Sequence, residues 1–258
     1  MSKIHPTAII DSKAELADDI EVSAYAVIGA GVKIDSGSWI GSHAVIEGPT
    51  TIGKENRIFQ FASVGAEPQD KKYKGEPTTL EIGDRNLIRE SVTINRGTVQ
   101  DIGKTVIGDD NWIMAYVHIA HDCVVGNNTI FANNATLAGH VTIHDYALLG
   151  GFTLVHQFCH MGEFAMTGMG TSLGKDLPPY VTAYGAPGIP RGINSEGLKR
   201  NGFTSEQRKN VKEAYRTLYR KDLPLNEAIQ ALQKVDDANI KLLSEFCKRS
   251  QSGRGIIR

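Results

Sequence analysis

The stretch IGDDNWIMAYVHIAHDCVVGNNTIF, residues 107–131, carries a large apolar residue at every sixth position. The same count in sixes extends along most of the chain. Six residues are too few for a strand, a helix and a return, but they suit one short strand and a corner. The sixth positions are Ile4, Ile10, Leu16, Val22, Ile28, Ile34, Ile40, Ile46, Ile52, Ile58 and Val64, then Ile82, Ile88 and Ile94, and then Ile107, Ile113, Ile119, Val125, Phe131, Leu137, Ile143, Leu149, Val155 and Met161.

This hexapeptide repeat predicts an all-β solenoid over residues 1–190. Between the apolar positions lie Gly, Asp, Asn, Ser, Thr and Ala, which permit tight turns and left-handed backbone geometry. Three faces of six residues make a coil of eighteen, and stacked coils point the apolar side chains inward as ladders. We therefore expect a parallel β-helix.

Two segments, residues 65–81 and 95–106, interrupt the repeat. The first is polar and rich in Lys, Gly and Pro. Because Val64 and Ile82 are eighteen residues apart, this segment is either a full irregular coil or one face plus an excursion loop, and the spacing leaves both open. Long loops on a rigid scaffold frequently carry function.

Residues 191–258 are predicted to form a C-terminal α-helical domain. Thr204 to Gln207 has the form of a capping box, and apolar residues follow it at helical spacing. Residues 225–235 and 240–247 indicate two more helices. Basic residues gather in this part of the chain, forming either a solvated face or a surface for an acidic partner or a phosphate. They are Lys199, Arg200, Arg208, Lys209, Lys212, Arg216, Arg220 and Lys221.

Composition excludes several classes of protein. The 28 Lys and Arg against 29 Asp and Glu argue against a general nucleic-acid binder. No apolar run approaches membrane-spanning length, and the first residues carry acidic side chains where a secretory signal needs an apolar stretch. Three widely spaced cysteines without a CxxC pattern argue against a disulfide framework. We expect a soluble, cytoplasmic protein.

The segment HIAHDC, residues 118–123, lies at one corner of the predicted solenoid. Ile119, Leu137 and Val155 are eighteen residues apart, so the residues that follow them share that corner on successive coils. We expect the three histidines there, His121, His140 and His156, to stack along one edge. His118 also points outward, whereas Cys123 falls at a small inward position and is predicted to pack in the core.

Two kinds of chemistry suit this corner. A histidine beside Asp122 is typical of a general base whose tautomer a carboxylate fixes. Stacked outward histidines also bind zinc in γ-class carbonic anhydrases, so a metal site stays open at this point. A set of hydrogen-bonded surface histidines is the plainest alternative.

Longer segments are similar to a known family. The strings QDKKYKGEPTTLEIGDRNLIRESVTI, RGTVQ, HIAHDCVVGN, ANNATLAGHV, GGFTLVHQFC, PPYVTAYG and NSEGLKRNGF, with the closing GRGIIR, resemble the UDP-N-acetylglucosamine O-acyltransferases that open lipid A biosynthesis. The resemblance covers nearly the whole chain. It implies a left-handed β-helix and a cytoplasmic homotrimer with active sites between neighbouring β-helices.

The resemblance also implies the reaction. Each site would move a 3-hydroxyacyl group from acyl carrier protein to the 3-hydroxyl of UDP-N-acetylglucosamine. No cofactor would be bound, because the donor brings its own 4'-phosphopantetheine on the carrier protein. The carrier is acidic and would meet the basic C-terminal helices.

Roles for individual residues follow from the same resemblance. His121 would be the general base, Asp122 would orient it, and the N–H of Gly139 would face the developing oxyanion. Residues that would hold substrate are Gln69, Asp70, Lys72, His118, His140, Gly151, His156, Gln157, Asn194, Glu196 and Arg200.

Four positions depart from the family pattern or vary within it. The family commonly has Arg at Asn201, His at Asn95 and Ile at Ser195, and the first change removes a cation that would meet phosphate. Met169 stands where members that take long chains tend to have Gly, at the far end of the acyl groove. A bulky side chain there predicts a donor of about ten carbons, because each excluded methylene is worth about 1 kcal/mol.

Three competing functions remain at this point. A γ-type carbonic anhydrase would share the scaffold but hold zinc. A related sugar-nucleotide N-acyltransferase would normally carry an additional N-terminal domain, whereas here the hexads begin at Ile4. A binding solenoid without catalysis would leave the corner histidines unexplained.

Overall fold

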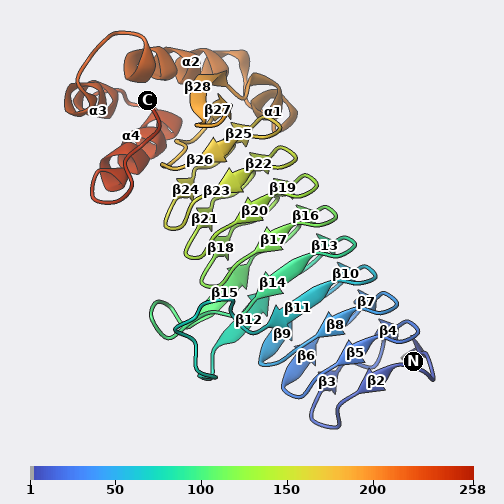
Figure 1. Ribbon diagram of the computed structural model, residues 1–258. Coiled ribbons are helices and arrows are strands. Elements are labelled where there is room, and N and C mark those ends of the chain that lie inside the picture. The colour runs from blue at the N-terminus through green and yellow to red at the C-terminus, as the bar shows by residue number, and fades with distance from the viewer. Residues whose placement is uncertain (1–2) are drawn as a thin grey trace.

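The computed structural model describes residues 3–258 and shows a stack of coils with a cluster of helices at its C-terminal end (Figure 1). Each of the first eight coils contributes one short strand to each of three sheets, which we name A, B and C. Sheet A contains β1 (Lys3–Ile4), β4 (Glu21–Val22), β7 (Trp39–Ile40), β10 (Arg57–Ile58), β13 (Leu87–Ile88), β16 (Trp112–Ile113), β19 (Ile130–Phe131), β22 (Leu148–Leu149), β25 (Met166–Thr167), β27 (Val181–Tyr184) and β28 (Ile189–Ile193).

The other two sheets complete the coils. Sheet B contains β2 (Ile9–Ile10), β5 (Val27–Ile28), β8 (Val45–Ile46), β11 (Ser63–Ala66), β14 (Thr93–Asn95), β17 (His118–Ile119), β20 (Thr136–Leu137), β23 (Leu154–Val155) and β26 (Ser172–Leu173). Sheet C contains β3 (Glu15–Leu16), β6 (Val32–Ile34), β9 (Thr50–Ile52), β12 (Thr79–Ile82), β15 (Lys104–Ile107), β18 (Val124–Val125), β21 (Thr142–Ile143) and β24 (His160–Met161). The predicted equivalence of Ile119, Leu137 and Val155 on successive coils is confirmed, because Ile119 pairs with Leu137 and Leu137 pairs with Val155.

The apolar sixth positions form the core of the β-helix. Every one of them from Val22 to Met161 is buried. Ile4 is 45 % exposed, because it belongs to the first coil and no coil below covers it. Full burial of such a side chain contributes about 1.5–3 kcal/mol, so repeated burial along the ladders holds the coils together.

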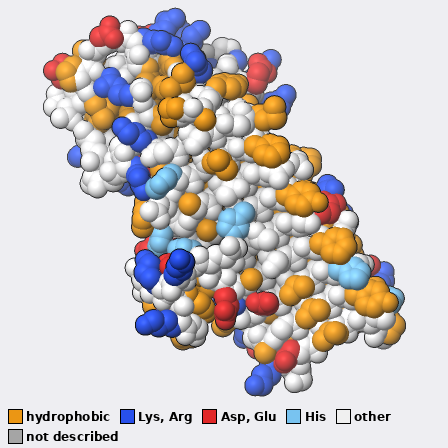
Figure 2. Space-filling model, viewed as in Figure 1, with side chains coloured by type: hydrophobic (Ala, Val, Ile, Leu, Met, Phe, Trp, Pro, Cys, Tyr) orange, Lys and Arg blue, Asp and Glu red, His pale blue; other side chains and the backbone are white. Residues whose placement is uncertain are grey.

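The corners use left-handed backbone at equivalent positions of successive coils. At the corner between sheets A and B, Tyr25, His43 and Phe61 have φ near +60° and stack ring on ring, with centroids 5.0 and 5.3 Å apart. Several side chains of this A–B corner are exposed and apolar, and Figure 2 shows such a row along the right edge of the molecule. Its exposed members are Tyr25, Phe61, Tyr116, Phe152 and Met169.

Both interruptions are excursion loops at the corner between sheets B and C. Loop 67–78 leaves between β11 and β12, and loop 96–103 leaves between β14 and β15. Ile58 pairs with Ile88 and Ile94 pairs with Ile119, so the extra residues fall within single coils and both of these coils keep their three strands. Of the two arrangements open for the first interruption, the structure therefore has the excursion. The two loops project from neighbouring coils (Figure 1).

Four helices close the C-terminal end of the stack. They are α1 (Ser195–Arg200), α2 (Ser205–Tyr219), α3 (Leu225–Gln233) and α4 (Ala238–Ser250). The capping box at Thr204 is confirmed, with reciprocal bonds to Gln207. The short helix α1 was not predicted. No helix within residues 3–258 combines the length and apolar character needed to cross a membrane.

Candidate active site

The B–C corner brings together most of the side chains singled out from the sequence. His121 follows β17, and Gly139 follows β20 on the next coil. The two excursion loops leave the same corner from the two coils that precede β17. A rigid, periodic edge is therefore flanked by the two long non-periodic segments of the β-helix.

His121 and Asp122 form a hydrogen-bonded pair. The Nδ1 of His121 lies 2.8 Å from Asp122 Oδ2. Asp122 is buried and also accepts hydrogen bonds from the Thr98 backbone N–H, at 2.9 Å, and hydroxyl, at 2.6 Å. Burial by itself opposes ionisation, but the bonds from His121 and Thr98 outweigh it and lower the pKa of Asp122. Because the carboxylate binds Nδ1–H, the neutral ring presents Nε2 as a proton acceptor.

Gly139 lies directly against this imidazole. A Cβ at Gly139 would stand 2.6 Å from His121 Cε1 and 2.8 Å from Nε2, so no larger residue fits without displacing the ring. Among the described residues, nothing accepts a hydrogen bond from the Gly139 N–H. Gly139, whose N–H is not engaged, therefore packs against the edge of the ring that carries Nε2.

His140 belongs to a second carboxylate–histidine pair. Its Nδ1 lies 2.6 Å from Asp101 Oδ2 in loop 96–103. Its ring stacks on Phe158, with centroids 4.4 Å apart, and meets His121 edge-on at 5.0 Å. The predicted stack of three histidines is wrong for His156, which is exposed and whose nearest ring bond is to the Gln157 carbonyl at 3.2 Å. The residue eighteen after His140 is Phe158, and it takes that place.

His118 and Gln157 flank the corner in different ways. His118 points outward from sheet B, and its Nδ1 lies 2.7 Å from the Thr93 hydroxyl. Burial, together with the charge of a protonated His121, lowers the pKa of His118 and favours its neutral form. Gln157 is exposed, and its carbonyl accepts a bond from Arg254 Nε at 3.0 Å.

Loop 67–78 carries the three other predicted substrate contacts, Gln69, Asp70 and Lys72. Gln69 and Lys72 are exposed. The backbone N–H of Lys72 bonds to Asp70 Oδ1 at 2.9 Å and is the main reason why the pKa of Asp70 is lowered. The charges of Lys72 and of a protonated His121 lower it further, in keeping with a loop that leaves the same corner two coils before β17.

The remaining predicted residues lie elsewhere on the chain. Asn194 caps α1 through Gly197 N–H, and with Arg200 and Asn201 it lines a cavity of about 310 Å³ against sheet A. The side chain of Asn201 bonds back to the Gly197 carbonyl. Glu196 and Ser195 line a neighbouring cavity of about 400 Å³. Gly151 and Met169 sit at the A–B corner, and Met169 is 80 % exposed.

One chain therefore presents three separate groups of candidate residues. The His121 group occupies the B–C corner, the Asn194 group the end of sheet A, and the Met169 group the A–B corner. Sequence reasoning missed Thr98 and Asp101, which hold His121 and His140 in place. The interruption at 95–106 marked that loop, but a break in a repeat carries no information on which side chains the loop contacts.

The site favours proton transfer over metal binding. The ligand atoms of His121, Asp122 and His140 lie within 4.8 Å of one another, as a metal would require. However, both oxygens of Asp122 already accept hydrogen bonds from Thr98 and His121, and His156 lies outside this group, so only two imidazoles remain as ligands. Cys123 is buried in the core as predicted, and burial raises its pKa to about 12, which makes it a poor thiolate ligand.

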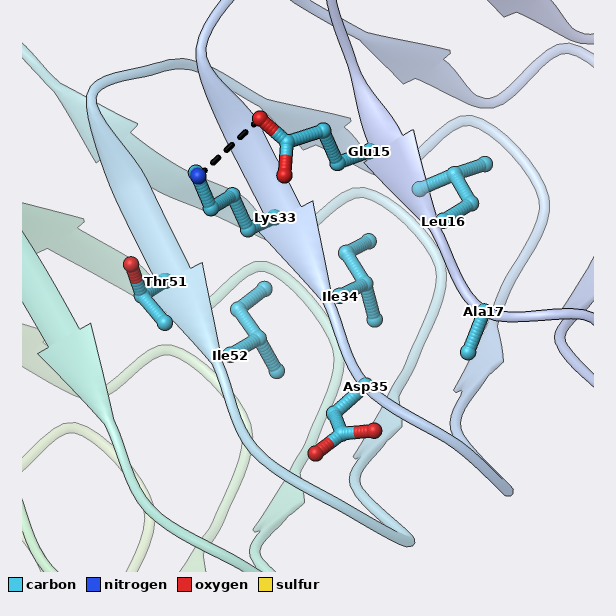
Figure 3. Close-up of a pocket in the computed structure, with 8 residues that line it drawn as sticks. All are labelled: Glu15, Leu16, Ala17, Lys33, Ile34, Asp35, Thr51 and Ile52. Carbon is cyan, nitrogen blue, oxygen red and sulfur yellow. Dashed lines mark ion pairs between the residues drawn. The ribbon is translucent and has the colours of Figure 1, made fainter.

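A separate cavity of about 430 Å³ lies against sheet C in the first coils (Figure 3). Two of its three charged residues, Glu15 and Lys33, pair with each other at 3.0 Å and are largely exposed. Its floor is formed by the inward residues Leu16, Ile34 and Ile52. It lacks the buried, oriented acid–base pair of the B–C corner.

Coils of six-residue faces with an oriented histidine at one corner define the class of hexapeptide-repeat transferases. A profile described as "Bacterial transferase hexapeptide (six repeats)" matches residues 104–139. A second profile, "Udp N-acetylglucosamine O-acyltransferase; Domain 2", matches residues 176–257.

Whole-chain relatives define the family. The chain is 60 % identical to the acyl-[acyl-carrier-protein]--UDP-N-acetylglucosamine O-acyltransferase of Janthinobacterium sp. (strain Marseille) and 58 % identical to that of Neisseria gonorrhoeae (strain ATCC 700825 / FA 1090), with all of both chains covered. The chain belongs to the acyl-[acyl-carrier-protein]--UDP-N-acetylglucosamine O-acyltransferase family.

Solved structures agree with this assignment. The UDP-N-acetylglucosamine acyltransferase of Francisella novicida has a TM-score of 0.96 at 42 % identity, covering 99 % of this chain and 94 % of its own. LpxA from Acinetobacter baumannii has a TM-score of 0.95 at 44 % identity, covering 99 % of both chains. The predicted left-handed parallel β-helix with a helical C-terminal region is confirmed.

Proposed function

We propose that the protein transfers a 3-hydroxyacyl group from acyl carrier protein to the 3-hydroxyl of UDP-N-acetylglucosamine, with His121 as general base. The observation that carries this proposal is the placement of the His121 ring between the buried Asp122, which bonds its Nδ1, and Gly139, which packs against its Nε2 edge and has an unbonded N–H. Full-length identity of 52–60 % to relatives named for this reaction supports the substrates. A three-histidine zinc site is disfavoured because His156 lies outside this group and both oxygens of Asp122 already accept hydrogen bonds.

The reaction needs only one proton carrier. His121 Nε2 takes the proton of the sugar hydroxyl as its oxygen attacks the thioester carbonyl, and Asp122 stabilises the imidazolium that forms. The N–H of Gly139 donates to the developing oxyanion. The carbon–sulfur bond then breaks, and the imidazolium returns its proton to the departing pantetheine thiolate. Because the thioester is already activated, no cofactor beyond the donor's own 4'-phosphopantetheine takes part.

We also propose that three chains assemble with active sites between them. The His121 group and the Asn194 group lie on different sides of one β-helix, so one substrate reaches both only if a neighbouring chain supplies one of them. The exposed apolar row at the A–B corner is of the kind that contacts between chains cover.

The acyl chain is proposed to run toward Met169. Met169 follows β25, three coils beyond β16, which is about 14 Å along the stack at the usual strand spacing. Leu154 and Phe152 are exposed on the same stretch of surface. A thioether at the end of such a groove would exclude several methylenes, so we propose a preference for about ten carbons over fourteen.

The donor's carrier protein is proposed to dock on the basic side of α2. Arg216 and Lys221 share Glu213, at 3.4 and 3.1 Å, so this acid neutralises only part of the charge. An acidic partner fits the remaining excess of positive charge.

Three free, buried cysteines suit the reducing cytoplasm, where we propose that the enzyme works.

Substitution of His121 tests the mechanism. His121→Ala should remain folded and associated while kcat falls about a hundredfold or more, the usual contribution of a positioned base. His5→Ala, at an exposed histidine of the first coil, is the matched control and should keep full activity. Near-normal turnover in His121→Ala would contradict the assignment, and stoichiometric zinc in active protein would favour the carbonic-anhydrase alternative.

A further inference from the structure

Arg96 is a buried cation at the base of loop 96–103. The residue is 6 % exposed, and its nearest carboxylate, Glu67, is 3.9 Å away and largely exposed. Its Nε has no hydrogen-bond partner among the residues that the structure describes. Burial of a weakly paired guanidinium lowers the free energy of unfolding, so a contribution to fold stability does not by itself explain this residue.

The bonds that Arg96 does make all lead to loop 67–78 or to the strand that precedes it. Nη1 donates to the Gly65 carbonyl at 2.6 Å, and Nη2 donates to the Tyr73 hydroxyl at 3.2 Å. The backbone N–H of Arg96 donates to the Ala66 carbonyl at 3.0 Å. Tyr73 in turn donates to the Glu76 carbonyl at 2.9 Å, which fixes the tip of the loop.

Loop 67–78 has few other attachments. Its remaining bonds are local, as from Lys72 N–H to Asp70 and from Lys74 N–H to Glu76, apart from one from Asn95 Nδ2 to the Glu67 carbonyl at 2.9 Å. Within the described residues, the side-chain hydrogen bonds that tie this loop to the β-helix come from Asn95 and Arg96. Asn95 ends β14, and Arg96 begins the loop whose Thr98 binds Asp122.

We infer that Arg96 is a positioning residue that sets loop 67–78 at the distance from His121 at which Asp70 and its neighbours meet the acceptor sugar nucleotide. The inference rests on the proposed function for the identity of that ligand. Arg96 does not touch the reacting atoms. It joins the loop that carries acceptor contacts to the loop that holds the base.

Limited proteolysis tests this inference without any assay of activity. Lys71, Lys72 and Lys74 are exposed trypsin sites in the loop. In Arg96→Met the loop should open more often, and native-state cleavage at these lysines should be faster by about tenfold or more. Arg85→Met is the matched control, because Arg85 pairs with Asp110 at 2.8 Å on another corner and should leave this rate unchanged. Cleavage of folded Arg96→Met at the wild-type rate would overturn the inference.

Kinetics give the second readout. Arg96→Met should raise KM for UDP-N-acetylglucosamine about tenfold or more, since a misplaced loop loses binding, with a much smaller fall in kcat than His121→Ala shows. If Arg96 acts through Asp70, adding Arg96→Met to Asp70→Ala should cost little more, whereas fully additive losses would overturn the inference.

A milder variant covers the case in which Arg96→Met fails to fold. Tyr73→Phe removes only the hydroxyl that accepts from Nη2, so it should shift both readouts in the same direction by less. Wild-type rates of loop cleavage in Tyr73→Phe would contradict the positioning role of Arg96. If the wild-type protein shows no acyltransferase activity, the proposed function is wrong. The proteolysis result then tests the positioning role of Arg96 by itself.

Discussion

Gly139→Ala is the sharpest test of the geometry at the B–C corner. The backbone of Gly139 is outside the left-handed region, so alanine is conformationally allowed there. Its methyl group would lie 2.6 Å from His121 Cε1, and ordinary contact begins at 3.4 Å, so the ring must move by about 0.8 Å. A shift of that size lengthens the 2.8 Å bond to Asp122 beyond hydrogen-bond range or turns Nε2 away from the hydroxyl.

The expected consequence is a fall in kcat of about a hundredfold, because a displacement near 1 Å at a reacting group costs about that much. This corresponds to about 2.7 kcal/mol of activation free energy. The measurement is steady-state kinetics with 3-hydroxyacyl carrier protein and UDP-N-acetylglucosamine, after size and circular dichroism have shown an intact fold. Gly174→Ala is the control, since a Cβ there meets open space. A folded Gly139→Ala enzyme within twofold of wild-type kcat would refute the reasoning.

Three further predictions concern pH, partner and chain length. The pKa of Asp122 is lowered by folding, so its carboxylate stabilises the fold above its ordinary pKa of 3.8 and loses that contribution as pH falls below it. The difference in free energy of unfolding between wild type and Asp122→Asn, from urea titrations, should therefore be largest near neutral pH and shrink below about pH 4. Reversing the charge of Arg216 and Arg220 should raise KM for acyl carrier protein donors several-fold more than for small thioester mimics, and equal effects would favour a merely solvated face. Met169→Gly should move donor preference from about ten carbons toward fourteen in a competition assay, and an unchanged preference would remove Met169 as the determinant.

The regular part of the fold could be predicted because each rung obeys one rule. Inward side chains recur every six residues and coils recur every eighteen residues. The burial of Ile40, Leu137 or Met161 therefore follows from counting along the sequence. The helices α2, α3 and α4 were also foreseen, since capping and apolar spacing are local signals. Helix α1 has only six residues and is held by the Asn194 cap, which is too short a pattern to detect.

The candidate site was only partly predictable, for a related reason. His121 and Asp122 are neighbours in sequence, so their pairing could be predicted once both were placed at the same corner of the β-helix. The stack failed at His156 because equivalent corner positions are eighteen apart, as Asp122, His140 and Phe158 are, and His156 is out of step with them. Each of those three residues has φ near +60°, which marks the true equivalent position at this corner.

The contacts that give the corner its chemistry come from segments that do not repeat. A bare β-helix would present His121 and His140 on an exposed edge, like the histidine and aromatic side chains at the A–B corner. Here Thr98 donates hydrogen bonds to Asp122, and Asp101 forms a hydrogen bond with His140. Arg96 donates to the Gly65 carbonyl at the base of loop 67–78. Because loops 67–78 and 96–103 enter consecutive coils at the same corner, they bond to each other as well as to the edge. Periodicity thus supplies rigid positions for the side chains of the proposed active site, and the two excursions supply the hydrogen-bond partners that distinguish this corner from the other two.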